Sequence, residues 1–392
     1  MKTLWIVTEL FPPDETSTAY IMGEIANAMS QKYVVKVITG PEIYDKRKKI
    51  DTNNLFRLNP YIQVYRVKTV DVDKNTIIGK AEGLLASSYK LAREVNIRVK
   101  AEDKVLLVTN PLPLIVFVAK LKKKIGFELN LLVHDIFPEN TKAANVKIPL
   151  RPIVSKLFAW AYSKADLYVV LGRDMVKVLK KKIQQFNKTP NIKIIENWAD
   201  TVSIWPIDRS GNDIISIEYA GNIGRGQGLC EFIDCLYESR NQNIQLHLYG
   251  TGALEESLRR DVKKRKIANV IFHGSYFRSQ QNEVLNNCDI ALVSLSDEAY
   301  GIGVPSKTYN ILASGKPILY LGHPESEIAL MVKEHDLGYV FSHHDKKGII
   351  GFLSKLDRKD IKNMKQMGVR GRIIAEERYS KEKILSMLFE TI

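Results

Sequence analysis

Short apolar runs alternate with longer amphipathic stretches along the whole chain. In the first half, runs of strand length lie at residues 3–8, 34–39, 62–67, 104–109, 129–134 and 165–171, with helical periodicity between most of them, as at 19–31 and 80–98. Such alternation is typical of a parallel sheet that is covered by helices on both faces. We therefore predict a doubly wound α/β domain for this half.

The alternation stops at residues 194–213, which contain Trp, Pro, Gly and Asp without a clear period, and it then starts again. Such a stretch is typical of a linker. Beyond it, the pattern predicts strands at 214–221, 244–250, 268–274, 288–295, 316–322 and 337–342, and helices at 227–240, 253–266, 306–314, 325–334 and 358–374. We therefore predict two α/β domains, 1–200 and 201–375, and a separate amphipathic helix within 376–392. In such sheets, ligands bind beyond the carboxyl ends of the strands.

The composition agrees with a globular protein of two domains. The chain has 392 residues, of which 45% are hydrophobic, and no apolar run approaches the roughly 20 residues that a membrane-spanning helix needs. The first apolar run is interpreted as a buried strand and not as a signal peptide. The three cysteines, Cys230, Cys235 and Cys288, have no metal-ligand spacing, and we expect buried free thiols in a reducing compartment.

The positive charge is concentrated in the first half. The chain carries a net charge of +14, and residues 1–200 hold 33 Lys and Arg against 20 Asp and Glu, a net of +13. Much of the excess lies in runs at 46–49, 120–124 and 177–182. A solvated helix face explains such runs, but their one-sidedness also suggests an anionic membrane surface or an anionic substrate. A nucleic acid is a third alternative, although no zinc-finger spacing or RNA-binding aromatic motif is present.

Glycine-rich loops follow the predicted strands of the second half. The turn at 221–228 contains four glycines and Arg225 and leads into a helix. Backbone amides can approach a ligand closely in such a turn, and a phosphate can rest at the helix start. The spacing is not that of a dinucleotide fingerprint, and a turn that only lets the helix pack remains an alternative.

Three further strand ends repeat this arrangement. Gly250 and Gly252 follow the next strand, Tyr276 lies in the loop after that, and Lys307 begins a helix with Asn310 one turn later. Four consecutive strand ends thus carry glycine loops, and two carry a cation. This repetition predicts a phosphate-bearing, nucleotide-sized ligand on the second domain. Lys307 would hold a diphosphate, and Asn310 would reach a hydroxyl-bearing part of the same ligand.

Two loops of the first half also have candidate site residues. Residues 16–18, Thr-Ser-Thr, precede a helix, and capping alone explains them as well as a ligand does. His134 and Asp135 end a predicted strand and are expected to point toward the cleft, although an isolated histidine is usually structural.

Several of these stretches resemble one enzyme family. The segments FPPDETSTAYIMGEIANAM, VHDIFPEN, YAGNIGRGQG, LYGTG and above all PSKTYNILASGKP are similar to the retaining glycosyltransferases of family four. The likeness spans essentially the whole chain and is greatest to bacterial enzymes that build O-antigen, capsule and colanic acid. It implies the GT-B fold, in which two Rossmann-like domains face each other across a cleft. It also implies a nucleotide-diphosphate sugar on the second domain, an acceptor on the first, no metal or other cofactor, and a final helix that returns to the first domain.

Matched position by position, the resemblance implies a role for each candidate residue. His134 would be catalytic and meet the donor sugar across the cleft. The remaining sets are Gly224, Arg225, Ser306 and Lys307 for the diphosphate; Glu298, Gly301, Ile302, Gly303, Val304, Pro305 and Asn310 for the donor sugar and ribose; Gly250, Gly252, Ser275 and Tyr276 for the base; and Thr16, Ser17 and Asp135 for the acceptor side.

The chain departs from the family pattern at three places. The two glutamates of the family's Glu-x7-Glu motif correspond to Ile302 and Asn310. Glu298 is the nearest carboxylate, in the loop 296–303 that would lie beside the donor sugar. The usual Gly-Gly near the N-terminus corresponds to residues 16 and 17. The usual Arg and Lys of the glycine-rich turn correspond to Asn222 and Gln227. These changes affect the phosphate geometry and not the fold.

The expected reaction is transfer of a sugar with retained anomeric configuration, from a UDP-sugar in preference to a GDP-sugar, to a glycan acceptor carried on a polyprenyl diphosphate. The enzyme is expected to be cytoplasmic and peripheral on the inner face of the membrane, held by lysines without an apolar anchor. Two alternatives are a catalytically silent nucleotide-sugar-binding protein of the same fold and a basic nucleic-acid-binding protein. A retaining hydrolase would need two carboxylates about 5 Å apart, and no such pair stands out.

Overall fold

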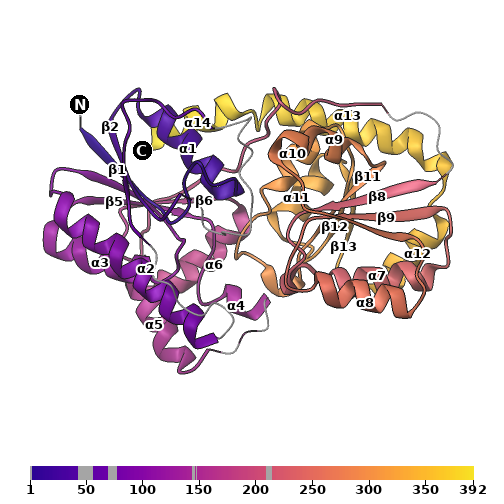
Figure 1. Cartoon of the computed structure of the whole chain (residues 1–392), viewed down its shortest axis with the longest axis horizontal. Coiled ribbons are helices and arrows are strands. Elements are labelled where there is room, and N and C mark those ends of the chain that lie inside the picture. The colour runs from indigo at the N-terminus through magenta and orange to yellow at the C-terminus, as the bar shows by residue number, and fades with distance from the viewer. Residues whose placement is uncertain (1, 43–55, 69–76, 144–145, 147, 209–213) are drawn as a thin grey trace.

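The computed structural model describes residues 2–42, 56–68, 77–143, 146, 148–208 and 214–392. They form two α/β domains that lie side by side (Figure 1). The basic run at 46–49 and the end of the predicted linker, 209–213, lie outside the described residues.

The first domain is built on a seven-stranded parallel sheet with the order β3-β2-β1-β4-β5-β6-β7. Its strands are β1 (Thr3–Val7), β2 (Val34–Thr39), β3 (Gln63–Arg66), β4 (Lys104–Val108), β5 (Glu128–Val133), β6 (Leu167–Val170) and β7 (Ile192–Ile194). Its helices are α1 (Ser17–Met29), α2 (Ile77–Arg98), α3 (Leu114–Ile125), α4 (Asn140–Ala143), α5 (Arg151–Tyr162) and α6 (Arg173–Ile183).

The second domain is built on a six-stranded parallel sheet with the order β10-β9-β8-β11-β12-β13. Its strands are β8 (Ile215–Ala220), β9 (Ile244–Tyr249), β10 (Val270–Gly274), β11 (Ile290–Ser294), β12 (Ile318–Leu321) and β13 (Gly338–Phe341). Its α-helices are α7 (Leu229–Ser239), α8 (Glu255–Lys264), α9 (Gln281–Asn286), α10 (Lys307–Ala313), α11 (Glu327–Glu334), α12 (Lys346–Lys355) and α13 (Ile361–Glu377). Single 3-10 turns occur at η1 (Arg225–Gln227), η2 (Arg278–Gln280), η3 (Asp297–Ala299) and η4 (Arg358–Asp360).

Burial on both faces explains the continuous apolar character of the strands. Every residue of β6 and of β8 is buried. In the first domain, α2, α3, α5 and α6 cover one face of the sheet, and α1 with the last helix, α14 (Lys381–Thr391), covers the other. Parallel strands need helical crossovers, which place apolar helix faces on both sides of the sheet.

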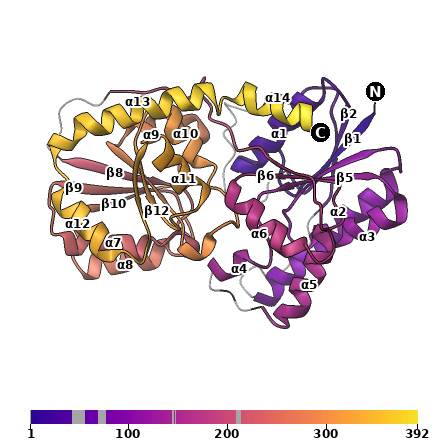
Figure 2. The same cartoon turned by 180° about the vertical axis from the view of Figure 1, so that it is seen from behind.

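The C-terminal segment joins the two domains. Helix α13 runs along the second domain, and α14 lies against α1 of the first (Figures 1 and 2). The hydroxyl of Tyr33 donates a hydrogen bond to the carbonyl of Ile392, and the ammonium of Lys32 donates to the carbonyl of Phe389. Because Ala199 of the linker bridges to Ser380, the two crossings between the domains lie side by side.

The two-domain α/β fold class predicted from the pattern is confirmed. The pattern did not predict α9, α12 or β7, which are short or lie next to irregular loops. The prediction of three buried thiols is wrong for Cys230, which is exposed, whereas Cys235 and Cys288 are buried. None of the helices that the structure describes has the length and hydropathy needed to cross a membrane.

Candidate active site between the domains

Two connected pockets open between the domains at the carboxyl ends of the strands. The first, which we call the lysine pocket, contains Lys307 and has a volume of about 360 Å³. The second, the histidine pocket, contains His134 and has a volume of about 540 Å³. They share the walls Ser17, Ile21, Asn197, Asn222, Gln227, Leu295, Pro305 and Ser306. One elongated ligand could therefore occupy both.

Lys307 is the main charged group of the lysine pocket. Its Nζ atom is buried, has no hydrogen-bond acceptor among the described residues, and lies 3.4 Å from the centroid of the Tyr219 ring. Burial lowers the pKa of Lys307 to about 7, and the nearby Glu218 carboxylate opposes this shift. A buried cation without an acceptor is costly, so the site is prepared for an anion from outside the protein.

A second cation, Arg278, reaches the lysine pocket from η2. Its guanidinium lies 3.4 Å from the centroid of the Tyr20 ring, which belongs to α1 of the first domain. Tyr276 lines the same wall of the pocket. Tyr276 was among the site residues predicted from the sequence, and Arg278 was not. The position of a cation two residues after Tyr276, in the same strand-end loop, could have indicated it.

Neutral amides occupy the glycine-rich turn after β8. If Gly224 carried a Cβ atom, it would lie 2.6 Å from Nδ2 of Asn222 and 2.7 Å from Oε1 of Gln227, so both side chains fold over this glycine. Arg225, in the same turn, is exposed and lines the histidine pocket, not the lysine pocket. The two cations in the wall of the lysine pocket are therefore Lys307 and Arg278.

His134 stands at the end of β5 in the wall of the histidine pocket. Its Nε2 atom is buried and has no hydrogen-bond partner among the residues that the structure describes. Burial lowers the pKa of His134 to about 4, so its imidazole is neutral at pH 7. Its backbone N–H donates to the hydroxyl of Thr109, as does that of Asp135, which fixes the loop.

Asn140, at the start of α4, lines the same pocket and was missed from the sequence. Its Oδ1 atom is buried and has no hydrogen-bond donor within the described part of the chain. Asn140 ends the segment VHDIFPEN, which begins at the end of the same strand as His134. Its place in this strand-end segment was the signal that could have found it.

The sugar loop at 301–305 touches the His134 loop directly. The N–H of Ile136 donates to the carbonyl of Ile302 over 3.1 Å. A Cβ atom on Gly303 would lie 2.8 Å from the carbonyl oxygen of His134, so a side chain there would push the loops apart. The contact requires glycine at this position and closes one end of the cleft.

Charged contacts from α6 hold the domains together beside this loop. The carboxylate of Asp174 accepts from the N–H of Gly301 over 3.2 Å. Arg173 forms ion pairs with Glu327 (2.9 Å) and Glu334 (2.7 Å) of α11. Glu327 is almost fully buried, so this pair is more than a surface contact.

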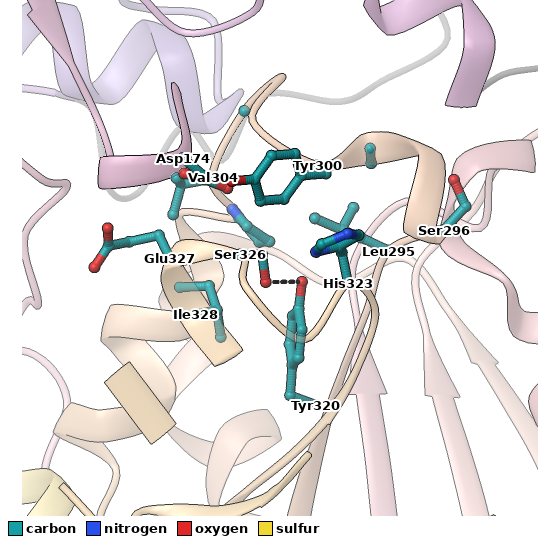
Figure 3. Close-up of a pocket in the computed structure, with 13 residues that line it drawn as sticks. Asp174, Leu295, Ser296, Tyr300, Val304, Tyr320, His323, Ser326, Glu327 and Ile328 are labelled. Atoms are coloured by element: carbon teal, nitrogen blue, oxygen red, sulfur yellow. Dashed lines mark hydrogen bonds between the residues drawn. The ribbon is translucent and has the colours of Figure 1, made fainter. Parts of the chain in front are cut away.

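A much smaller cavity lies behind the sugar loop (Figure 3). Its volume of about 10 Å³ is close to the lower limit for one water molecule. Tyr300 packs over His323, and Ser326 donates a hydrogen bond to the Tyr320 hydroxyl over 2.8 Å. The side chains around this cavity pack against the sugar loop, and the cavity has no room for a substrate.

The structure gathers most of the predicted residues around the two pockets. The pocket walls include His134, Asp135, Ser17, Gly224, Arg225, Tyr276, Ile302, Gly303, Val304, Pro305, Ser306, Lys307 and Asn310. Asn310 also accepts a hydrogen bond from the N–H of Asp200, so its amide oxygen fixes the linker.

Six other predicted residues lie outside both pocket walls: Thr16, Gly250, Gly252, Ser275, Glu298 and Gly301. Thr16 caps α1 by accepting from the N–H of Ala19. Cβ atoms on Gly250 and Gly252 would collide with the backbone at Gly221 and Ile223, respectively, so these glycines allow neighbouring loops to pack.

Comparison with known proteins relates this architecture to glycosyltransferases. Residues 215–357 match the family model described as glycosyl transferases group 1. The chain is 26% identical to a protein of Pseudomonas aeruginosa, the probable glycosyltransferase WbjE, in an alignment that covers 97% of this chain and 95% of that protein.

Solved structures with the same fold extend the comparison to both domains. Sucrose-phosphate synthase from Thermosynechococcus elongatus superposes with a TM-score of 0.76 at 13% identity, over 100% of this chain and 98% of that one. Anabaena HepE in complex with UDP-glucose gives a TM-score of 0.68 at 14% identity, over 100% and 99% of the two chains. The whole chain thus has the GT-B fold, and residues 215–357 of its second domain match the family model of the group 1 glycosyl transferases.

Proposed function

We propose that this protein transfers a glycosyl group from a nucleotide-diphosphate sugar to a glycan acceptor, with the anomeric configuration retained. The observation that carries the proposal is the Nζ atom of Lys307, which is buried in the lysine pocket and lacks an acceptor among the described residues. A donor diphosphate would supply the missing negative charge. The match of the surrounding domain to group 1 glycosyl transferases supports the same assignment.

In the proposed reaction, the nucleoside diphosphate leaves with growing negative charge. Lys307 and Arg278 would stabilise this charge electrostatically, and the closed cleft would strengthen their effect. The base would lie near Tyr276, and the donor sugar would extend into the histidine pocket between His134 and the sugar loop. The acceptor would approach from the first domain, on the side of Ser17 and Asp135. The nucleotide sugar is a substrate in this proposal, and no metal cofactor is part of it.

A UDP-sugar is the proposed donor, and a glycan linked to polyprenyl diphosphate is the proposed acceptor. The Anabaena HepE structure contains UDP-glucose, and the WbjE relative is named a probable glycosyltransferase; both support a sugar donor of this class. The excess positive charge in residues 1–200 favours an anionic acceptor or membrane surface. The proposed location is therefore the cytoplasmic face of the membrane in a pathway of surface polysaccharide synthesis.

A panel of nucleotide sugars tests this proposal. One UDP-sugar should raise the melting temperature of the protein more than any GDP-sugar does, because a ligand of the folded state stabilises it once its concentration exceeds Kd. The same donor should be consumed, with release of UDP, and EDTA should leave its consumption unchanged. Binding without any transfer or donor hydrolysis would favour the catalytically silent alternative, and the absence of any shift would refute the donor site.

Asn140 is expected to form a hydrogen bond with the donor sugar and so to contribute to sugar specificity. We expect Asn140→Ala to lower kcat/KM for the preferred UDP-sugar about five- to tenfold, because a hydroxyl or amide group of the sugar loses a buried hydrogen bond worth about 1–1.5 kcal/mol. Affinity for UDP alone should stay near normal, since UDP does not extend to the histidine pocket. Steady-state kinetics with two UDP-sugars measures the change in preference.

Asn197→Ala is the matched control, because Asn197 lines both pockets but is not among the buried amides without a partner. An Asn140→Ala enzyme with unchanged preference and kcat/KM would remove Asn140 from the sugar site.

A further inference from the structure

Helix α5 presents an apolar ridge to solvent. Leu150 is 71% exposed, Ile153 is 65% exposed and Leu157 is 42% exposed. Ile153, Leu157 and the half-buried Trp160 recur at spacings of four and three residues, which places these three side chains along one side of the helix, and Leu150 is the residue before its first turn. The opposite side carries Phe158 and Tyr162, which are buried in the core of the first domain. Trp160 also packs against the edge of that core, whereas Ile153 and Leu157 are not part of it.

Lysine-rich helices flank this ridge on both sides. Helix α5 packs against α3 and α6 and forms the lower edge of the first domain between them (Figures 1 and 2). The exposed lysines Lys120, Lys123, Lys180 and Lys181 belong to these two helices, and Lys156 is exposed on α5 itself. The basic runs at 120–124 and 177–182, which are far apart in sequence, thus lie on one side of the sheet with the ridge between them.

The helix segments around the ridge carry positive charge only, although Asp166 pairs with Lys122 of α3 and Glu139 pairs with Lys182 of α6. Residues 114–125, 150–164 and 177–188 contain no Asp or Glu. The ammonium of Lys164 lies 5.8 Å from the centroid of the Trp160 ring, so a cation borders the aromatic end of the ridge as well. A protein partner usually meets a mixed pattern of charges, whereas an anionic bilayer has a uniform negative surface above an apolar interior.

We propose that α5 is a membrane-docking helix whose ridge, Leu150, Ile153, Leu157 and Trp160, enters the headgroup region of an anionic bilayer while the lysines of α3 and α6 bind its phosphates. An amphipathic helix of this composition lies in the plane of the interface, with its apolar side inserted. Tryptophan at the end of the ridge suits the boundary between headgroups and acyl chains. This proposal adds an apolar ridge to the expectation from sequence, in which lysines act without an apolar anchor.

Docking through α5 would add a membrane partner to the proposed function. Its role in bringing the acceptor to the enzyme depends on that function. Helix α4, which carries Asn140 and Ala143 of the histidine pocket, lies at the same lower edge as α5 (Figure 1). A bilayer beneath this edge would bring a lipid-linked acceptor to the first-domain side of the cleft. The binding itself needs no sugar chemistry, so it can be measured separately from transfer.

Sedimentation of the full chain with vesicles tests the docking surface. Wild-type protein should bind vesicles of phosphatidylcholine with 30% phosphatidylglycerol and should bind pure phosphatidylcholine at least tenfold more weakly. The double variant Ile153→Gln, Leu157→Gln should lose at least tenfold in partitioning to the anionic vesicles. The variant Lys180→Gln, Lys181→Gln should bind less at low salt and show a weaker salt dependence.

Val369→Gln, Ile373→Gln is the matched control, because these side chains are 60% and 45% exposed and four residues apart on α13 of the second domain. It should bind as the wild type does. Brominated lipids should quench Trp fluorescence in the wild type, and Trp160→Phe should remove most of that quenching. Melting temperature and UDP affinity should stay unchanged in every ridge variant.

Three results would overturn the proposal. The wild-type chain could ignore anionic vesicles at low salt, or the ridge variant could bind as tightly as the wild type. The ridge substitutions could instead change the oligomeric mass while vesicle binding stays the same, which would make the ridge a contact between protein copies. Because none of these readouts needs turnover, loss of the proposed glycosyltransferase activity would leave the test intact.

Discussion

Lys307→Met is expected to weaken UDP binding about ten- to a hundredfold and at the same time to stabilise the ligand-free protein. The first effect follows because charge-assisted hydrogen bonds to the diphosphate are lost, at about 1.5–3 kcal/mol each. The second follows because burial lowers the pKa of Lys307 to about 7, which makes the free site unfavourable for the cation. Calorimetric titration with UDP and thermal melts of the free protein measure the two effects.

The pH dependence gives this prediction a second signature. The unfolded chain, with a lysine pKa of 10.5, binds more protons between pH 7 and 10.5 than the folded one, so the contribution of Lys307 to stability rises with pH over that window. In contrast, UDP affinity should fall between pH 7 and 9, because the bound diphosphate requires a protonated lysine. Both trends should be absent from Lys307→Met, whose advantage in stability near pH 7 should be roughly a few kcal/mol.

Lys316→Met is the matched control for a buried lysine. Lys316 is also buried in the second domain, but its ammonium donates to the carbonyl of Ile207 and it lines neither pocket. Its replacement should leave UDP affinity unchanged and should lower stability. If Lys307→Met binds UDP as the wild type does, Lys307 is not part of the donor site.

His134→Ala is expected to lower kcat by about a hundredfold with little change in UDP affinity. The buried Nε2 of His134 faces the histidine pocket, where the donor sugar and not the nucleotide is proposed to lie. Because burial lowers the pKa of His134 to about 4, its imidazole stays neutral, and the activity profile should have no step near pH 6.5 from this residue. Single-turnover kinetics with saturating donor separates the chemical step from binding.

His134→Gln tests whether a hydrogen-bonding side chain at this position restores part of the rate. His335→Ala is the control, because His335 is half-buried at the C-cap of α11 and lies outside both pockets. A fully active His134→Ala enzyme would show that the histidine is structural. If that variant unfolds while His134→Gln is stable and fully active, the same conclusion holds.

The fold could be predicted from the chain because its signals are local. Strands such as β6 and β12 are apolar at every position, since both faces of a parallel sheet are covered, and the amphipathic stretches between the strands complete the alternation. The donor side could be recognised for a related reason. Parallel strands end at one edge of the sheet, so Lys307 and Tyr276, in loops that follow two of these strands, were expected at the same edge, where both line the lysine pocket.

Contacts between side chains on opposite sides of the cleft could not be predicted from the sequence pattern. Arg278 meets Tyr20 only because η2 faces α1, and the sugar loop meets the segment after β5, which holds His134 and Asn140, only because the two domains face each other. These contacts depend on how one domain is oriented on the other, and that orientation depends on side-chain packing and ion pairs such as Arg173 with Glu327. No spacing along the chain encodes such a geometry.

The same distinction applies to the surface of the first domain. By itself, the sequence determined the two-domain α/β architecture, the excess of positive charge in residues 1–200 and the glycine loops with Lys307. Only the tertiary structure decided that two distant lysine runs flank one helix and that Ile153 and Leu157 remain exposed between them. The physical reason is that an apolar residue on an amphipathic helix has the same local pattern whether it faces a core or solvent, and only packing against the rest of the fold decides between the two.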